Sequence, residues 1–477
     1  MKASLVSTAS YSSARIVSAL VGVLAVPVYT HLLTLEAYGI YAIAFSTVSV
    51  LNALLFHWIT AATARIYPSH LGNIPRFTGL VLGFWVRSMG VLFILSTIAW
   101  LVAPSRFTGI VLASSALLVT TSIYEFALEL SRSALRPGAY AVAVVIYALI
   151  GLAVGSALAY TDHGAVSPLW GLAAGQAAAV IALRRIGIVR LSWDADAAER
   201  RSVIRHMVMY GVPLSAALVL SMLLASVDRY LIEHFLGLAA VAVFAASYAL
   251  IFPGIVLVAS VINLTGYPRI MRAYEAGDEG GLKTLLREQV TALLLVLLPL
   301  LLGAILLTQQ ITSALPSGRY TAGVQLLPYI ALAAILNVLR STYVDLALHI
   351  SKKVLWLVGS LLVALTVGVT VNLVTLPHLG IAGAAFALCA CYLAALIMSV
   401  LGAMKYHALP LPAVRESIAI VVGLVLMWFL LHGAPSRMTL PELTILITKG
   451  AVAYVVGLAA CWLVLTKAGL LSPKGRI

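Results

Sequence analysis

The sequence predicts an all-α polytopic membrane protein, with about fourteen transmembrane helices arranged in two pseudo-repeated lobes. Three observations predict this fold class: an extreme apolar composition, long apolar runs between short polar breaks, and an internal repeat. Of the 477 residues, 62% are hydrophobic and 10% are charged, and the mean hydropathy is +1.07. A soluble domain carries about 25% charged residues. A chain this apolar would expose too much hydrocarbon in water, so lipid must be its solvent.

Fourteen apolar runs of sufficient length follow one another along the chain. A transmembrane helix needs about 20 apolar residues, and charged residues, Pro or Gly bound each run. These runs leave little chain for an extramembrane domain. They cover residues 8–33, 38–64, 77–103, 107–131, 138–160, 165–183, 207–235, 238–264, 284–308, 322–349, 354–376, 380–404, 414–433 and 443–466.

The basic residues are distributed unevenly between the two sides of these runs. The termini, the loops after even-numbered runs and the adjoining parts of the runs hold 23 Lys and Arg residues, whereas the loops after odd-numbered runs and the adjoining parts of the runs hold four. Because Lys and Arg favour the cytoplasmic side during insertion, we expect both termini in the cytoplasm. This topology accounts for the net charge of +14, so no nucleic-acid partner is expected.

The loops indicate where the chain divides. The outer connections at 34–37, 161–164 and 377–379 are too short for an outer catalytic domain, and the most polar stretch, 184–206, lies on the inner side. We therefore expect a linker between two lobes. The predicted organisation is an N-terminal lobe over 1–183 (six spans), a cytoplasmic linker over 184–206, a C-terminal lobe over 207–405 (six spans) and two additional spans over 406–477.

An internal repeat supports two lobes built on one plan. Residues 33–45 align with residues 236–248 at a constant offset of 203, with leucines matching at 33/236 and 35/238 and aromatic residues at 41/244 and 45/248. Each copy is predicted to be a helix, a tight outer turn and a second helix. Many secondary transporters bind their substrate near the bilayer midplane between such repeats.

Four segments resemble a known family: Tyr29–Tyr41, Tyr210–Pro213, Asp228–Ile232 and Phe235–Gly237. They are similar to bacterial polysaccharide flippases, the O-antigen and exopolysaccharide translocases of the multidrug/oligosaccharidyl-lipid/polysaccharide superfamily. The resemblance implies a V-shaped, positively charged central cavity. It also implies transfer of undecaprenyl-pyrophosphate-linked oligosaccharides across the bacterial inner membrane, with a polysaccharide polymerase and a chain-length regulator as candidate partners.

Polar residues within three N-terminal spans are candidates for the substrate cavity. Charged side chains inside a membrane cost about 2.5–3.5 kcal/mol on insertion scales and are often functional. Arginines can hold a pyrophosphate through bidentate hydrogen bonds. Alternatives stay open: Arg15 as an interfacial residue, Arg87 paired with Glu125, and His57 as a packing residue. The predicted cavity residues are Arg15, Arg87, His57, Tyr11 and Ser49.

Three acids are candidates for coupling or gating. Glu125 precedes Glu129 and Arg132 at helical spacing, which also favours a structural ion pair. Asp228 lies near the outer turn of the second repeat, where capping is an equally simple role. Asp345 lies close to Arg340 and His349, which makes an ion pair possible. A buried carboxyl in any of these places can carry a coupling proton.

The motifs that the sequence lacks favour a transporter over an enzyme. The sequence has no Gly-x-x-x-x-Gly-Lys-[Ser/Thr], His-Glu-x-x-His or Gly-x-Ser-x-Gly motif, so we expect no ATPase, metal site or cofactor. The three cysteines lie in apolar runs and are expected to pack there. Two alternatives remain: a multidrug or cation antiporter of the same superfamily, which favours acids in the first span, and a membrane-embedded polysaccharide polymerase or ligase, which favours a long outer loop.

Overall fold

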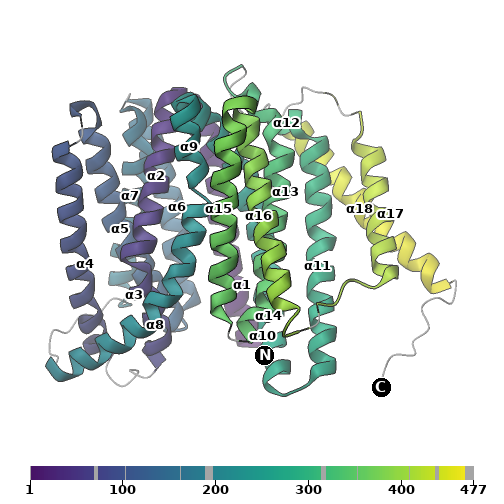
Figure 1. Cartoon of the computed structure of the whole chain (residues 1–477), viewed down its shortest axis with the longest axis horizontal. Helices are drawn as coiled ribbons and strands as arrows, with labels where there is room; N and C mark the ends of the chain where they lie inside the picture. Colours follow the sequence, from purple (N-terminus) through teal and green to yellow (C-terminus); the bar gives the residue numbers. More distant parts are fainter. Residues whose placement is uncertain are drawn as a thin grey trace. The chain divides into compact units, whose positions relative to one another are not determined.

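The computed structural model describes residues 2–68, 74–102, 104–161, 163–188, 197–312, 318–351, 353–407, 409–433, 435 and 440–467. Within these ranges every regular element is a helix (Figure 1). The chain divides into two compact units, Met1–Ala245 (unit 1) and Ala246–Ile477 (unit 2). The described part contains 13 helices that are long and apolar enough to cross a membrane. The predicted class, an all-α polytopic membrane protein, is therefore confirmed.

Unit 1 contains nine α-helices and the start of a tenth. The predicted third span corresponds to α4. Residues 189–196 of the predicted linker lie outside the described residues, and α8 begins within its second half. The helices are α1 (Lys2–Leu32), α2 (Leu35–Leu55), α3 (His57–Ile66), α4 (Ile74–Val102), α5 (Thr108–Ser133), α6 (Pro137–Tyr160), α7 (Ser167–Arg185), α8 (Ala197–Leu224), α9 (Val227–Leu236) and α10 (Leu238–Glu275).

The run predicted over 38–64 is broken into α2 and α3 at Phe56. Phe56 has φ −123° and ψ −28°, outside helical geometry, and its carbonyl accepts the backbone N–H of Ile59 at 3.0 Å. The indole Nε1 of Trp58 donates to the carbonyl of Leu55 at 3.0 Å. A carbonyl freed by a helix break must find a partner away from lipid, and the Trp58 side chain provides one. At the break between the two helical segments, the carbonyls of Leu55 and Phe56 therefore both have hydrogen-bond partners.

Helices α6 and α7 pack closely because glycines face one another. Gly151 and Gly155 lie four residues apart in α6, as do Gly171 and Gly175 in α7, so each pair lies on one helix face. A Cβ on Gly171 would come within 2.5 Å of the Gly151 carbonyl oxygen, and a Cβ on Gly175 within 2.5 Å of the Tyr147 carbonyl oxygen. Small residues at this spacing let membrane helices approach backbone to backbone.

The two copies of the repeat both form a helix, a tight turn and a helix, as predicted. In the first copy, Thr34 caps α2 by accepting the backbone N–H of Ala37 at 3.2 Å. In the second, Gly237 turns the chain between α9 and α10 with φ +81°, a conformation that favours glycine. The two turns meet within unit 1: a Cβ on Gly39 would overlap the carbonyl oxygen of Leu238.

Unit 2 contains the rest of α10 and a second set of helices. One of its membrane helices is interrupted by a π-helical turn, Arg340–Val344, which separates α13 from α14. Such turns inside helices occur frequently at functional sites. The helices are α11 (Glu279–Leu306), α12 (Thr308–Thr312), α13 (Leu327–Leu339), α14 (Asp345–Ile350), α15 (Val354–Leu379), α16 (Ile381–Ala403), α17 (Val414–Leu431) and α18 (Leu440–Lys467).

The last two helices, α17 and α18, are tied to the rest of unit 2 at both ends. Before α17, the buried Tyr343 hydroxyl donates to the carbonyl of Pro410 at 2.5 Å. In its first turn, Glu416 accepts the hydroxyl of Thr291 at 3.0 Å. After α17, the buried Gln310 amide donates to the carbonyl of Pro435 at 2.8 Å. The added pair is therefore integrated into its unit through side-chain hydrogen bonds.

Candidate substrate-binding site

Arg15 lies on α1 and faces α6. Its Nε donates to the hydroxyl of Tyr140 at 3.4 Å. The neighbouring Ala14 is buried in a small apolar cluster with Tyr140 and Val144, whereas Arg15 itself is exposed. One edge of the guanidinium is thus oriented by a phenol, and among the described residues its Nη atoms have no hydrogen-bond or ion-pair partner.

The other predicted cavity residues are not joined to Arg15 by a contact among the described residues. Ser49 is half-buried and donates to the carbonyl of Phe45 at 2.8 Å. His57, the first residue of α3, is half-buried and interacts electrostatically with Arg132. The side chains of Tyr11 and Arg87 lie outside the described part of the structure, so their predicted roles remain predictions.

Two acids on α5 have different partners. Glu129 forms an ion pair with Arg132 at 2.5 Å and accepts the hydroxyl of Ser133 at 3.1 Å. Glu125, one turn earlier, accepts the side-chain amide of Asn52 at 2.8 Å instead. Because Asn52 belongs to α2, this hydrogen bond connects two membrane helices.

Tyrosines from α5 and α6 surround Glu125. The rings of Tyr124 and Tyr147 lie 5.1 Å apart between centroids, and both phenols interact electrostatically with the Glu125 carboxyl. Tyr124 also interacts with Tyr140, the residue that contacts Arg15. Polar side chains of α1, α5 and α6 therefore lie near one another within unit 1.

The tyrosine cluster extends toward the first repeat turn. The Tyr41 ring lies 6.1 Å from that of Tyr29 and 5.7 Å from that of Tyr38, between centroids. Tyrosine offers a flat apolar face and a hydroxyl that both donates and accepts. These are the groups that a sugar ring requires. We define the tyrosine cluster as Tyr29, Tyr38, Tyr41, Tyr124, Tyr140 and Tyr147.

The tyrosine cluster was not among the predicted site residues, although the sequence contains a signal for it. The chain has 20 Tyr and 12 Phe residues, and burying a phenol in lipid requires a partner for its hydroxyl. Tyr140 and Tyr147 are seven residues apart, which places them on one helix face. The polar stripes that led to the predicted site residues lie on other helices than α6.

The other two predicted acids are buried. Asp228 lies in the first turn of α9, where the helix dipole favours a negative charge. Asp345 forms an ion pair with Arg340 at 2.6 Å, and their side chains are only 6% and 7% exposed. This pair lies at the π-helical turn, so an ion pair of Asp345, one of the possibilities left open by the sequence, is present.

Each unit also has a largely apolar cavity. In unit 1 a cavity of about 430 Å³ lies between α2, α4, α5 and α9, with Thr47, Ser96 and Tyr230 among its few polar lining residues. In unit 2 a cavity of about 690 Å³ lies between α10, α11, α17 and α18 and is lined almost entirely by aliphatic side chains. Neither lining offers a charged cluster for a pyrophosphate.

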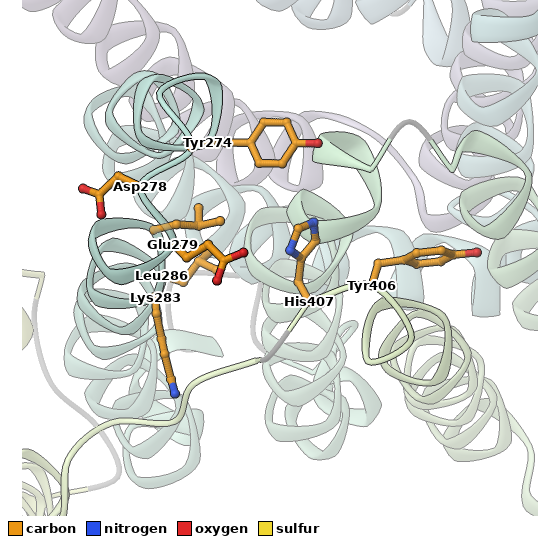
Figure 2. A pocket seen from close by; sticks show the side chains of 9 residues that line it. Tyr274, Asp278, Glu279, Lys283, Leu286, Tyr406 and His407 are labelled. Atoms are coloured by element: carbon orange, nitrogen blue, oxygen red, sulfur yellow. The ribbon is translucent and has the colours of Figure 1, made fainter.

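A more polar pocket of about 450 Å³ lies in unit 2, between the α10–α11 turn and the end of α16. Figure 2 shows the side chains of Glu279 and His407 pointing toward one another in it. The Tyr274 ring meets the His407 ring edge to face, with centroids 5.9 Å apart. Lys283 also lines the pocket. Because acidic and basic groups are mixed here, the pocket does not select an anionic headgroup.

Among the described residues, no group of three His, Cys, Asp or Glu side chains is arranged to hold a metal ion. All three cysteines are free thiols, and the thiol of Cys389 contacts the carbonyl of Tyr329 at 3.1 Å. The polar groups of unit 1 thus form the candidate site.

Solved structures share this fold. A lipid II flippase, MurJ, in an inward closed conformation superposes with a TM-score of 0.75 at 13% identity and covers 96% of this chain and 99% of its own. A multidrug resistance MATE family transporter of the MOP superfamily superposes in its inward-facing conformation with a TM-score of 0.62 at 13% identity. The match covers 83% of this chain and 97% of that transporter. An outward-facing MATE structure superposes with a TM-score of 0.57 at 14% identity, and the match covers 84% of this chain and 95% of that structure.

The sequence itself places the chain in a family. No curated protein sequence matches the chain. Residues 28–325, more than half of the chain, match the family described as polysaccharide biosynthesis protein. Both repeat turns and all residues of the tyrosine cluster lie within this match. The chain therefore belongs to this polysaccharide biosynthesis protein family and has the fold of MOP-superfamily transporters.

Proposed function

We propose that this protein is a flippase that translocates undecaprenyl-pyrophosphate-linked oligosaccharides across the bacterial inner membrane. The family match indicates polysaccharide biosynthesis, and the fold is that of transporters, one of which is a lipid II flippase. The observation that carries the proposal is the set of polar side chains in unit 1 that includes the pair of Arg15 and Tyr140 and the pair of Glu125 and Asn52.

The chemistry of this interior suits a lipid-linked sugar. The Arg15 guanidinium, with Arg87 from α4, binds the pyrophosphate and replaces part of the hydration that its charge loses in the membrane. The tyrosine cluster, with Tyr11, Ser49 and His57, receives the sugars. The isoprenoid tail remains in the bilayer, because it gains nothing from a polar groove.

The repeat turns act as an outer gate in this proposal. Gly39 lies against the carbonyl of Leu238, and the hydroxyls of Thr47 and Tyr230 lie 2.8 Å apart. These contacts join the first copy of the repeat to the second. When the lobes over 1–183 and 207–405 rock apart at this end, the contacts break and a V-shaped central cavity opens outward. Asp228 fixes the second turn.

The proposed topology follows the distribution of Lys and Arg. Both termini lie in the cytoplasm, so substrate enters from the side on which lipid-linked sugars are assembled. A polysaccharide polymerase and a chain-length regulator act on the product after its release at the outer leaflet. The protein needs no cofactor for this task, because alternating access moves the headgroup without breaking bonds.

The proposal is tested with purified protein in vesicles that carry a fluorescent undecaprenyl-pyrophosphate-linked oligosaccharide. A membrane-impermeant quencher added outside reports the fraction of headgroups in the outer leaflet. We expect the quenched fraction to rise from about one half toward completion as the protein exchanges lipids between leaflets. Vesicles without protein, and vesicles with an Arg15→Ala variant, are the controls. A quenched fraction equal to that of empty vesicles contradicts the proposal.

A multidrug or cation antiporter is the second candidate, because MATE transporters share the fold. The first helix favours the flippase: α1 contains Arg15 and no acid that would hold a cation. Export of a cationic dye from the same vesicles, without movement of the glycolipid, would support the antiporter instead.

A further inference from the structure

We propose that the Glu125 carboxyl is a proton-binding site and that Asn52 responds to its protonation state. In transport, this site couples a proton to the movement of the headgroup, a role that rests on the proposed function. Proton binding itself does not rest on it and is measured separately below.

Glu125 and Asn52 meet inside the membrane-spanning part of unit 1. Glu125 is half-buried in α5, and Asn52 is 5% exposed in the last turn of α2. The Nδ2 of Asn52 donates to Oε2 of Glu125 at 2.8 Å. Among the described residues, this amide is the one hydrogen-bond donor to the Glu125 carboxyl.

The charge of Glu125 is not compensated by a cation in the described part of the structure. Glu129, one turn later, has Arg132 at 2.5 Å, whereas Glu125 forms no ion pair among the described side chains. An ionised group inside the membrane is costly, and one hydrogen bond from an amide recovers only part of that cost. Taking up a proton removes the remaining cost.

The helices around Glu125 contribute few titratable side chains among the described residues. Helix α6 contributes phenols, which are neutral at physiological pH, and α2 and α7 contribute amides. The His57 ring at the start of α3 interacts with Arg132 rather than with Glu125. The side chain of Arg87 in α4 lies outside the described residues. The groups packed around this part of α5 are Tyr140 and Tyr147 of α6, Asn52 of α2, His57 of α3 and Gln176 of α7.

The Asn52 amide can satisfy both states of the carboxyl. Its Oδ1 is buried and has no hydrogen-bond partner among the described residues. The ionised carboxylate accepts from Nδ2. The protonated carboxyl instead donates its O–H to Oδ1, once the amide has rotated by half a turn. A hydronium ion of the aqueous phase supplies the proton and is left as water, and the hydrogen bond from Nδ2 is exchanged for the one to Oδ1.

The protonation state is communicated to the joint between α2 and α3. The carbonyl of Asn52 accepts the backbone N–H of Phe56 at 2.9 Å, the last such bond before the break. An ionised Glu125 holds α2 by a charge-assisted bond, which is about twice as strong as a neutral one. Protonation weakens this hydrogen bond between Glu125 and α2, close to the break at Phe56.

Infrared difference spectroscopy of the full chain in lipid nanodiscs tests proton binding directly. Lowering the pH should produce the C=O stretch of a protonated carboxyl, and this band should be absent in Glu125→Gln. In Asn52→Leu the band should shift in frequency, because its hydrogen-bond acceptor is lost. Glu129→Gln is the matched control, since it removes an acid from the same helix, and should retain the band.

Transport then tests the coupling. With an imposed proton gradient, wild-type protein should accumulate the fluorescent glycolipid in one leaflet, and Glu125→Gln should only equilibrate it. A Glu125→Gln variant that keeps the infrared band, or that still responds to the gradient, overturns the inference. Wild-type protein that moves no glycolipid at all overturns the proposed function, while the infrared titration still decides whether Glu125 binds a proton.

Discussion

The backbone of Gly39 in α2 lies directly against the carbonyl oxygen of Leu238 in α10, so that no side chain fits between the two repeat turns. Gly39→Ala should therefore weaken the outer contact by about 1–3 kcal/mol, the usual cost of overpacking. Each 1.4 kcal/mol is a tenfold change in an equilibrium.

This change is measured by cross-linking Thr47→Cys to Tyr230→Cys, in a chain whose three native cysteines are replaced by serine. We expect cross-linking to be about tenfold slower with Gly39→Ala. Gly90→Ala is the control, because a Cβ at that exposed position meets nothing within 4 Å. Equal rates in both variants would refute the proposed gate.

A second expectation concerns the packing of α6 against α7. Gly171→Ala places a methyl group 2.5 Å from the Gly151 carbonyl oxygen and should destabilise unit 1 by about 1–3 kcal/mol. The measurement is the midpoint of thermal unfolding in detergent. Gly22→Ala, in α1, meets nothing within 4 Å and should leave the midpoint unchanged. An unchanged midpoint for Gly171→Ala would show that the helices separate easily.

The buried ion pair of unit 2 should be sensitive to the loss of either partner. Asp345→Asn leaves Arg340 charged and buried and should cost about 3–5 kcal/mol. The surface pair of Arg269 and Glu288, at 3.2 Å with side chains 55% and 54% exposed, is the control, and Glu288→Gln should cost less than about 1 kcal/mol. Thermal unfolding of both variants measures the difference. Similar midpoints for the two would argue against a desolvated pair at the π-helical turn.

Arg15 is expected to be essential for export. Arg15→Ala should abolish surface polysaccharide while the protein remains in the membrane, and Arg15→Lys should restore part of it, since lysine keeps the charge but not the bidentate geometry. Tyr140→Phe removes the phenol that orients Arg15 and should reduce export less than Arg15→Ala does. Arg87→Ala should behave like Arg15→Ala. Immunoblots of cell-surface glycan and of membranes measure both quantities. Normal export by both alanine variants would eliminate this site.

The helices and the repeat were predictable because they depend on local apolar periodicity and length. The turn at Gly237 was predictable for a different reason: few residues other than glycine adopt its φ of +81°. The break at Phe56 was not, because neither Gly nor Pro, the usual signals of a helix break, lies near it. It depends on the Trp58 indole reaching back to Leu55, which is a three-dimensional contact.

The types of residue in the candidate site were predictable from the sequence, but only some of their hydrogen-bond and ion-pair partners were. The residues around Arg132 were expected to pair along one helix, and Glu129 does so. Glu125 instead accepts a hydrogen bond from Asn52 on another helix, and no spacing within one helix predicts a contact between two helices. The tyrosine cluster was missed for the same reason: its members come from four helices, and no spacing in the chain connects them.

The anchoring of α17 and α18 has a consequence for truncated chains. A chain that stops after α16 would leave the Tyr343 phenol, the Gln310 amide and the Thr291 hydroxyl without their present acceptors. Tyr343 lies two residues before Asp345, so the loss would also reach the ion pair at the π-helical turn. Deleting the final hairpin should thus yield a chain that cellular proteases degrade, rather than a shorter working transporter.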